Sequence, residues 1–276
     1  MARDYRWGLF LNEISLFFLV QALGLYVGYK LFLAEEIIAL GASSSIITFL
    51  TSFTISTIAL VLVIKYFKPS GLFKLLFAFL IFVGAETVFG VFIPVGYLGV
   101  ALAAVLVALR FYHPTVLTQN LALIIAIAGI SANLGLLFPL SAVLVILAIL
   151  SVYDVIAVYQ TKHMLTLFKG LLDSGTPFAI IVPDKNISVH ESIANAKPGT
   201  GKFLMLGTGD LAFPIIFAVS ALPMGIAHSL AILAGSLVGM LSVHIILTQK
   251  KTGAIPALPP IIFASLIAFI ISLYLF

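Results

Sequence analysis

The sequence predicts an all-α membrane protein whose helices form one bundle. Hydrophobic residues make up 62% of the 276 positions and charged residues only 9%, and the mean hydropathy is +1.26. These values lie far outside the range of soluble domains. Because about 20 apolar residues cross a bilayer as a helix, the chain has room for roughly eight to ten crossings. The lack of cysteine excludes disulfides and cysteine-ligated metal sites.

Nine apolar runs along the chain predict nine transmembrane helices. They fall at about 7–29, 43–64, 73–93, 95–109, 119–138, 140–160, 203–222, 225–247 and 257–275. Pro94 separates the third run from the fourth and Pro139 separates the fifth from the sixth, since proline interrupts a helix. The first run is too long for a secretory signal and carries Asn12, Glu13 and Gln21, so we expect a retained helix.

The positive charges predict how the nine helices are oriented. In the nine-helix arrangement, 13 of the 14 lysines and arginines fall on one side of the membrane, and only Lys30 falls on the other. Since the cytoplasmic side collects Lys and Arg, we expect a multi-pass protein of the cell membrane with its amino terminus in the cytoplasm and its carboxyl terminus outside. The net charge of +4 then reflects membrane orientation, and we expect no nucleic-acid partner.

The longest polar stretch divides the bundle into six helices and three. It predicts an amino-terminal part at 1–160, a cytoplasmic loop at 161–202 and a carboxy-terminal part at 203–276, all within one membrane domain. Within the loop, HMLTLFKGLL has the spacing of an amphipathic surface helix. PFAIIVP is typical of an extended segment, and ISVHESIANAKPGTG is typical of a mobile linker.

Two aspartates lie inside apolar runs, where a carboxylate costs several kcal/mol unless it is paired, hydrated or protonated. Asp154 lies about seven residues before the cytoplasmic end of the sixth helix, and Asp210 about seven residues after the start of the seventh. At 1.5 Å per residue, both lie roughly 10 Å below the same membrane face. The sequence therefore predicts two carboxyl groups at matching depth on antiparallel neighbours.

Two carboxyl groups in contact do not readily both ionise, so the pair is expected to hold one proton near neutral pH. Such a pair provides an acid and a base together, as in aspartyl proteases. The ionised member takes a proton from water, while the protonated member polarises the scissile carbonyl. This chemistry needs neither a metal ion nor another cofactor.

Glycines and prolines surround these positions. Gly207 and Gly209 remove side chains beside Asp210 and allow another backbone to come close, although such glycines also serve helix packing. The segment PALPP at 256–260 predicts an irregular entry to the last helix with free carbonyl groups. Taken alone, these prolines also fit a plain helix start.

Together, these motifs resemble those of the GxGD intramembrane aspartyl proteases, most closely the presenilins and their archaeal homologues. The resemblance rests on Tyr153-Asp154 in the sixth helix, Gly207-Thr208-Gly209-Asp210 in the seventh and Pro256-Ala257-Leu258 at the ninth, and it extends to the nine-helix plan. The related signal peptide peptidases carry similar motifs in the opposite orientation, so the charge pattern favours the presenilin-like branch. Thr208 stands where eukaryotic presenilins usually carry leucine.

The resemblance implies peptide-bond hydrolysis within the transmembrane segments of other membrane proteins. It makes Asp154 and Asp210 the catalytic pair. The residues that it places around the substrate are Tyr153, Gly207, Thr208, Gly209, Pro256, Ala257 and Leu258. It further implies type-I-like substrates in the lipid bilayer that pair as a strand near the start of the seventh helix, where KFLML at 202–206 is the candidate edge.

Other polar residues in the bundle have simpler interpretations. Glu86 fits a structural role better than a proton relay, and Glu13 is expected near the membrane interface. His228 and His244 are sixteen residues apart on one helix, so they cannot share a metal there, and we expect them to be packed and neutral. Asn133 is expected to form an interhelical hydrogen bond.

The alternative function is an ion- or proton-coupled transporter or a channel. In that case, Asp154, Asp210 and Glu86 would form a pathway across the membrane, a common use of intramembrane charges. The three motifs favour proteolysis over transport. The oligomeric state, including a homo-oligomer, stays open.

Overall fold

The computed structural model describes residues 7–34, 70–161, 175–183, 188–195, 203–249 and 255–276. These residues contain eight α-helices. They are α1 (Trp7–Leu33), α4 (Ser70–Phe92), α5 (Gly96–Tyr112), α6 (Val116–Leu137), α7 (Leu140–Ile156), α9 (Thr208–Ser220), α10 (Ile226–Gln249) and α11 (Leu258–Leu275). A π-helical turn, Ala157–Thr161, continues α7, and short 3₁₀ turns occupy Ile193–Asn195 and Leu222–Met224.

The eight helices coincide with eight of the nine predicted apolar runs. The run predicted at 43–64 lies outside the described residues, so the count of nine and the division into six and three stay predictions. Six of the described helices are long and apolar enough to cross a membrane, while α5 and α9 are shorter apolar helices. The chain is therefore a multi-pass, predominantly helical membrane protein.

The helix boundaries follow local rules of capping and proline geometry. Pro139 precedes α7 in extended conformation, which accounts for the break after α6. Thr115 caps α6 through reciprocal side-chain and backbone hydrogen bonds with Thr118. Pro94 lies in the three-residue connection between α4 and α5. The two prolines that divide the apolar runs in the sequence thus divide helices in the structure.

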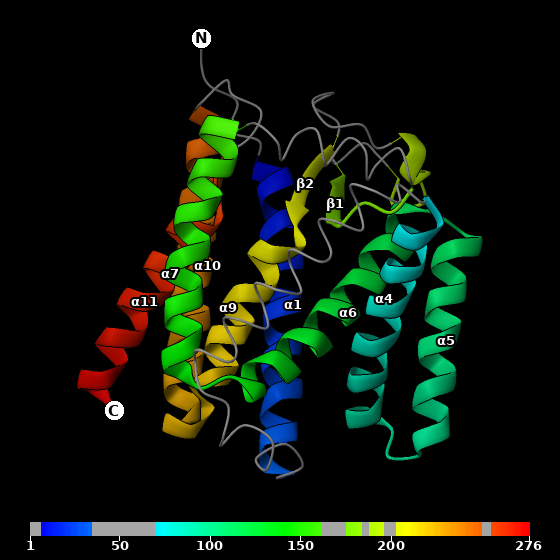
Figure 1. The fold of residues 1–276 in the computed structure, drawn as a ribbon. Coiled ribbons are helices and arrows are strands. Elements are labelled where there is room, and N and C mark those ends of the chain that lie inside the picture. Colours follow the sequence, from blue (N-terminus) through cyan, green and yellow to red (C-terminus); the bar gives the residue numbers. More distant parts are fainter. Residues whose placement is uncertain (1–6, 35–69, 162–174, 184–187, 196–202, 250–254) are drawn as a thin grey trace.

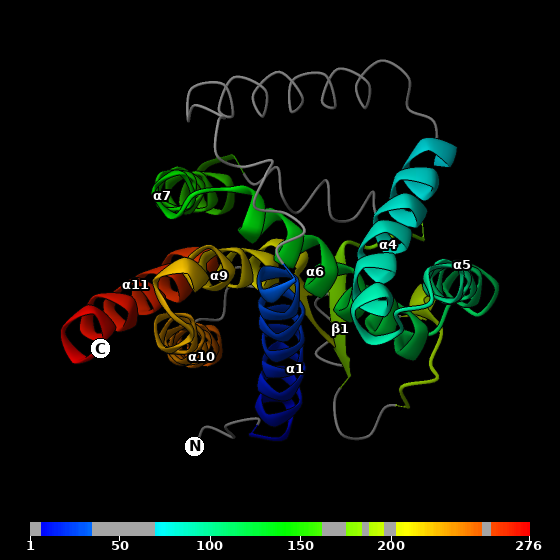
Figure 2. The same ribbon diagram turned by 90° about the horizontal axis from the view of Figure 1, so that it is seen from below.

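The helix α9 lies at the centre of the bundle. It packs against α1, α6, α7, α10 and α11, and Figure 2 shows these helices around it, with α4 and α5 on the far side of α6. Its residues from Ile215 to Val219 are all buried. A helix that is apolar on every face, as this one is, belongs in the interior of a membrane protein.

Close helix packing depends on glycines that face a neighbouring backbone. A methyl group on Gly84 of α4 would overlap the Ala126 carbonyl of α6, and one on Gly129 of α6 would overlap the Gly84 carbonyl. On the other side of the bundle, Gly235 and Gly239 of α10 lie equally close to the backbone of α11. Small residues permit this close approach where water does not drive the helices together.

Two short strands form a sheet at one end of the bundle. The strand β1 (Ala179–Pro183) pairs antiparallel with β2 (Phe203–Gly207), and Ile181 lies opposite Met205. In Figure 1 this sheet lies at the end where α7 finishes and where α9 and α11 begin, and we call it the sheet end. The extended segment predicted at PFAIIVP is therefore confirmed. Residues 203–206 of the candidate edge KFLML lie in β2, so the helix predicted at 203–222 begins only at Thr208.

One expectation for the polar loop is wrong. Residues 188–195, predicted as part of a mobile linker, are hydrogen-bonded to the start of α6. Val116 N–H donates to Glu191 O over 3.0 Å, and Leu117 N–H donates to Val189 O over 2.8 Å. The physical reason is that Ile193 is buried in a small apolar cluster with Val116. The predicted amphipathic helix HMLTLFKGLL lies outside the described residues.

Candidate active site

Asp154 lies near the carboxyl end of α7, and its side chain is only partly exposed. Its Oδ2 atom accepts a hydrogen bond from the backbone N–H of Leu258 over 3.2 Å. Leu258 is the first residue of α11. A carboxylate at this position satisfies a donor that the helix cannot satisfy itself, and the helix dipole adds to the attraction.

The prolines after Leu258 explain why this one donor matters. Pro259 and Pro260 have no N–H, so Leu258 carries the only N–H among the first three residues of α11. The N-cap residue, Ala257, has no side chain that could accept from it. Asp154 therefore takes the capping role from a different helix and ties the end of α7 to the start of α11.

Asp210 occupies the first turn of α9, where the amino-terminal end of a helix favours negative charge. The strand β2 runs directly into this helix, with Gly207 as the N-cap. A Cβ atom on Gly207 would lie 3.0 Å from Asp210 Oδ2. The carboxyl group thus folds back over the glycine, and this is the close approach that the GTGD sequence allows.

The structure brings the two aspartates to the same end of the bundle. The helices that carry them, α7 and α9, are in contact. The prediction that Asp210 lies about seven residues inside its helix is wrong, because Phe203–Gly207 form β2 and Asp210 is in the first turn of α9. The matching depth of the two aspartates stays a prediction.

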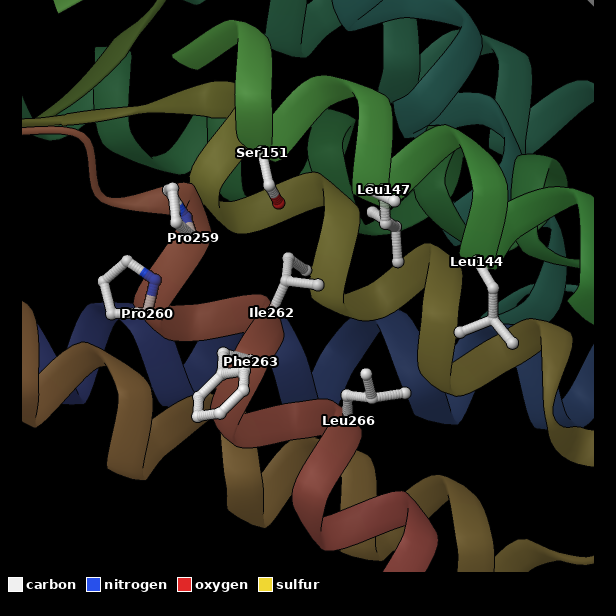
Figure 3. A pocket seen from close by; sticks show the side chains of 9 residues that line it. Leu144, Leu147, Ser151, Pro259, Pro260, Ile262, Phe263 and Leu266 are labelled. Atoms are coloured by element: carbon white, nitrogen blue, oxygen red, sulfur yellow. The ribbon is translucent and has the colours of Figure 1, made fainter. Parts of the chain in front are cut away.

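A groove lies on the outside of the bundle between α7 and α11. It has a volume of about 470 Å³, and Figure 3 shows Leu144, Leu147 and Ser151 of α7 facing Ile262 and Phe263 of α11 across it. Its lining is almost entirely apolar. Because the Phe263 side chain is 66% exposed, the groove lies on the face of the bundle that lipid or another helix would cover.

The remaining motif residues occupy different surroundings. Pro256, Ala257 and Leu258 are buried beside Asp154 at the start of α11. Thr208 and Gly209 line a separate cavity of about 200 Å³ among α4, α6 and α9. Tyr153 is 64% exposed on α7, so the structure does not bring its ring to the two carboxyl groups.

The other intramembrane polar residues lie away from the aspartates or pair with each other. Glu86 is exposed beside a polar cavity of about 500 Å³ that Lys30 and Asn133 also line, and Lys30 belongs to the last turn of α1, far from the sheet end. Asn133 donates to Thr87 Oγ1 over 2.8 Å, which confirms the predicted interhelical hydrogen bond. His228 is hydrogen-bonded to Ser272 at 2.8 Å and is packed as predicted.

Glu13 lies in the interior of the bundle, and its expected position near the membrane interface stays a prediction. Its side chain is 2% exposed, and its Oε2 atom lies 2.7 Å from Nδ1 of His244, which is also buried. The reason is that α1 packs against α10, so that two polar groups near the helix ends meet in the interior. Burial of a carboxylate is tolerated when a hydrogen-bonding partner accompanies it.

Two groups of side chains near the site have roles that the sequence did not reveal. Gln21 of α1 is buried and donates to the Leu211 carbonyl of α9 over 3.0 Å, one residue after Asp210. Gln119 and Asn120 of α6 bind the backbone of β1. The available signal was an amide in an apolar run, but sequence alone does not say which backbone such an amide meets.

Comparisons with known protein families and solved structures identify proteins that resemble this chain. The family model described as signal-peptide peptidase, presenilin aspartyl protease matches residues 14–276. A solved structure of a presenilin family intramembrane aspartate protease in space group C222 superposes with a TM-score of 0.65 at 19% identity, covering 98% of this chain and 99% of that one. Another, in space group P2, gives 0.64 at 22% identity, covering 95% and 96%. No curated protein sequence gives a significant match.

Proposed function

We propose that Asp154 and Asp210 form the catalytic pair of this protein. The chain belongs to the signal-peptide peptidase, presenilin aspartyl protease family and is thus an aspartic endopeptidase. The proposed reaction is hydrolysis of peptide bonds within the transmembrane segments of other membrane proteins. The observation that carries the proposal is the hydrogen bond from Leu258 N–H to Asp154 Oδ2. It joins the motif segments of α7 and α11, and α9, which carries Asp210, packs against both helices.

The proposed mechanism uses one proton shared by the two carboxyl groups. The ionised carboxylate takes a proton from a water molecule whose oxygen attacks the scissile carbonyl carbon, while the protonated carboxyl donates to the carbonyl oxygen. The pair then passes a proton to the amide nitrogen and takes one back from a hydroxyl of the tetrahedral intermediate, as the C–N bond breaks to give a carboxylic acid and an amine. The proton belongs to the pair rather than to either residue, because the two sites are coupled.

The surroundings of the pair suit a substrate that is a helix outside the active site and a strand within it. The apolar groove between α7 and α11 offers a surface for a lipid-embedded helix. Peptide groups exposed by unwinding need new hydrogen-bond partners in a membrane, and the backbone of β2 lies directly before Asp210. We propose that the unwound segment adds to β2 as a further strand.

The orientation inferred from the charges completes the proposal. It puts the sheet end on the cytoplasmic side of the cell membrane, so water would reach the aspartates from the cytoplasm and type-I-like proteins would be the substrates. A transport pathway built on three carboxylates is less well supported. Glu86 borders a cavity shared with the last turn of α1, at the other end of the bundle from the two aspartates.

A reconstituted cleavage assay tests the proposed function. The purified protein is incorporated into liposomes with a single-span substrate, and the products are identified by mass spectrometry. We expect cleavage within the membrane segment, its loss in Asp210→Asn, and its retention in the matched control Glu86→Gln. Absence of cleavage across several substrates, together with a proton flux that depends on Glu86, would support transport instead.

A further inference from the structure

We propose that Asn120, on α6, is a positioning residue that closes the outer edge of β1, so that a substrate strand can add to the sheet only along β2. This inference rests on the proposed function, because it concerns how a substrate strand reaches the aspartates. It assigns a role in choosing the cleavage position to a side chain that does not touch the reacting atoms.

Asn120 binds β1 as a neighbouring strand would. Its Nδ2 donates to the Ile181 carbonyl over 2.7 Å, and its Oδ1 accepts from the Ile181 N–H over 2.9 Å. One side-chain amide thus satisfies both main-chain groups of Ile181 on the edge that faces away from β2. Asn120 is only 7% exposed, so bulk water does not compete for these hydrogen bonds.

The other outward-facing carbonyls of β1 are covered in the same way. Gln119 Nε2 donates to the Ala179 carbonyl over 3.3 Å, and Asn12 of α1 donates to the Pro183 carbonyl over 3.5 Å. Pro183 itself has no N–H to offer a further strand. A helix laid along a sheet edge is an established way to prevent unwanted strand pairing.

Gln119 is held in turn by a buried cation. Its Oε1 accepts a hydrogen bond from Nε of Arg110, whose side chain is 1% exposed, and Arg110 also donates to the Gly175 carbonyl over 2.9 Å. These bonds fix the segment that leads into β1 to the junction of α5 and α6. The closed edge is therefore anchored to the helical bundle rather than suspended from the loop.

The alternation of an antiparallel ladder identifies the backbone groups left for a substrate. Because the groups of Ile181 face Asn120, the pair Ile181↔Met205 is one that does not exchange hydrogen bonds across the sheet. The N–H and C=O of Met205 therefore point to the outer edge of β2. In the described part of the chain, this sheet has only two strands, so Met205 is the central attachment point for an added strand.

Fixing β1 also fixes the register of the added strand relative to Asp210. The strand β2 continues without interruption through Gly207 into α9. A strand added to the outer edge of β1 would instead lie one strand spacing, about 4.8 Å, farther from β2, the strand that leads into Asp210. A slip of two residues along β2 would move the substrate by roughly 7 Å while keeping the same side chains on each face.

The test compares cleavage positions in Asn120→Leu with those in Asn133→Leu. Asn133 is a matched control because it lies on the same helix but binds Thr87 instead of the sheet. We expect Asn120→Leu to lower the share of the major product at least threefold, with new products displaced by two residues and a raised KM. We expect Asn133→Leu to retain the original product pattern.

A second variant and a second measurement separate positioning from folding. Asn120→Asp keeps the size of the side chain and the acceptor for Ile181 N–H but removes the donor, so we expect an intermediate product pattern. Hydrogen exchange of the Ile181 amide requires no activity, and it should speed up at least tenfold in Asn120→Leu but not in Asn133→Leu.

The outcomes distinguish this inference from the proposed function. An unchanged product pattern in Asn120→Leu, whatever its rate, would overturn the positioning role while leaving the catalytic pair intact. Unchanged exchange at Ile181 would overturn it as well, even in a preparation without protease activity. Failure of the catalytic pair would appear instead as cleavage that survives in Asp210→Asn.

Discussion

The contact between Gly207 and the carboxyl group of Asp210 gives the sharpest prediction about the site. The backbone of Gly207 has φ −61° and ψ 141°, a conformation that alanine adopts without strain. Gly207→Ala therefore adds one methyl group and little else. That methyl carbon would lie 3.0 Å from Asp210 Oδ2, whereas ordinary contacts begin at 3.4 Å.

The size of the effect follows from this shortfall of 0.4 Å, which the carboxyl group has to absorb by moving. Misplacement of a reacting group by 1 Å can cost about 100-fold in rate, so a shift of 0.4 Å corresponds to roughly a sixfold fall in kcat. KM should change little, because the only side chain that the methyl group would meet within 4 Å is that of Asp210. The assay is the initial rate of cleavage of a single-span substrate over a range of substrate concentrations.

Gly90→Ala on α4 is the matched control, because a Cβ atom at Gly90 meets no other atom within 4 Å. We expect its kcat to equal that of the unaltered protein. The reasoning would be refuted if Gly207→Ala kept its full kcat. It would also be refuted if the loss merely tracked a smaller fraction of folded protein in thermal unfolding.

Three further predictions concern the catalytic pair and the bundle. The cleavage rate should fall on both sides of an optimum pH, since a doubly ionised pair has no acid and a doubly protonated pair has no base. A cleavage rate that does not change across the titration of both groups would count against the pair. Glu13→Ala removes the carboxylate that lies 2.7 Å from Nδ1 of the buried His244, and we expect about 2 kcal/mol lower stability in detergent unfolding, in contrast to a near-zero effect of Glu86→Ala at an exposed site. Gly129→Val should prevent correct packing of α4 against α6, because the Cβ atom of the new side chain would overlap the backbone of Gly84. A normal yield and a monodisperse peak in size-exclusion chromatography would contradict this prediction.

Much of the fold was predictable because transmembrane helices are recognisable from their apolar composition and their length. Each described helix falls on a predicted apolar run, and the breaks fall at Pro94 and Pro139 as predicted. The extended segment around β1 was also predicted, because apolar residues bounded by prolines favour strands. The edge in β2 was expected only from the family resemblance, since its residues continue the apolar run at 203–222. Orientation in the membrane rests on the charge pattern alone and stays a prediction.

The site was predictable in outline for a similar reason. A carboxylate in an apolar run is rare and costly, so Asp154 and Asp210 stand out, and counting residues from the helix ends put them at one depth. The motif around Leu258 also pointed to the start of the last helix. What the sequence did not show is that Leu258 N–H donates to Asp154, because that bond depends on how α7 and α11 pack.

The contacts that escaped prediction all join residues far apart in the chain. Glu13 and His244 are separated by 231 positions, and each is unremarkable within its own helix. Asn120 and Ile181 are separated by 61 positions, and only their shared place at the sheet end gives the amide its role. Local periodicity carries no information about such partners, which are fixed by helix packing.

The most direct test of the central claim is whether the two aspartates act as one unit. The cleavage rates of Asp154→Asn, Asp210→Asn and the double variant are measured side by side with one single-span substrate. Because residues that act together are not additive, we predict that either single change removes as much activity as both together. Substantial cleavage in either single variant, or a double variant whose loss is the product of two partial losses, would contradict the account.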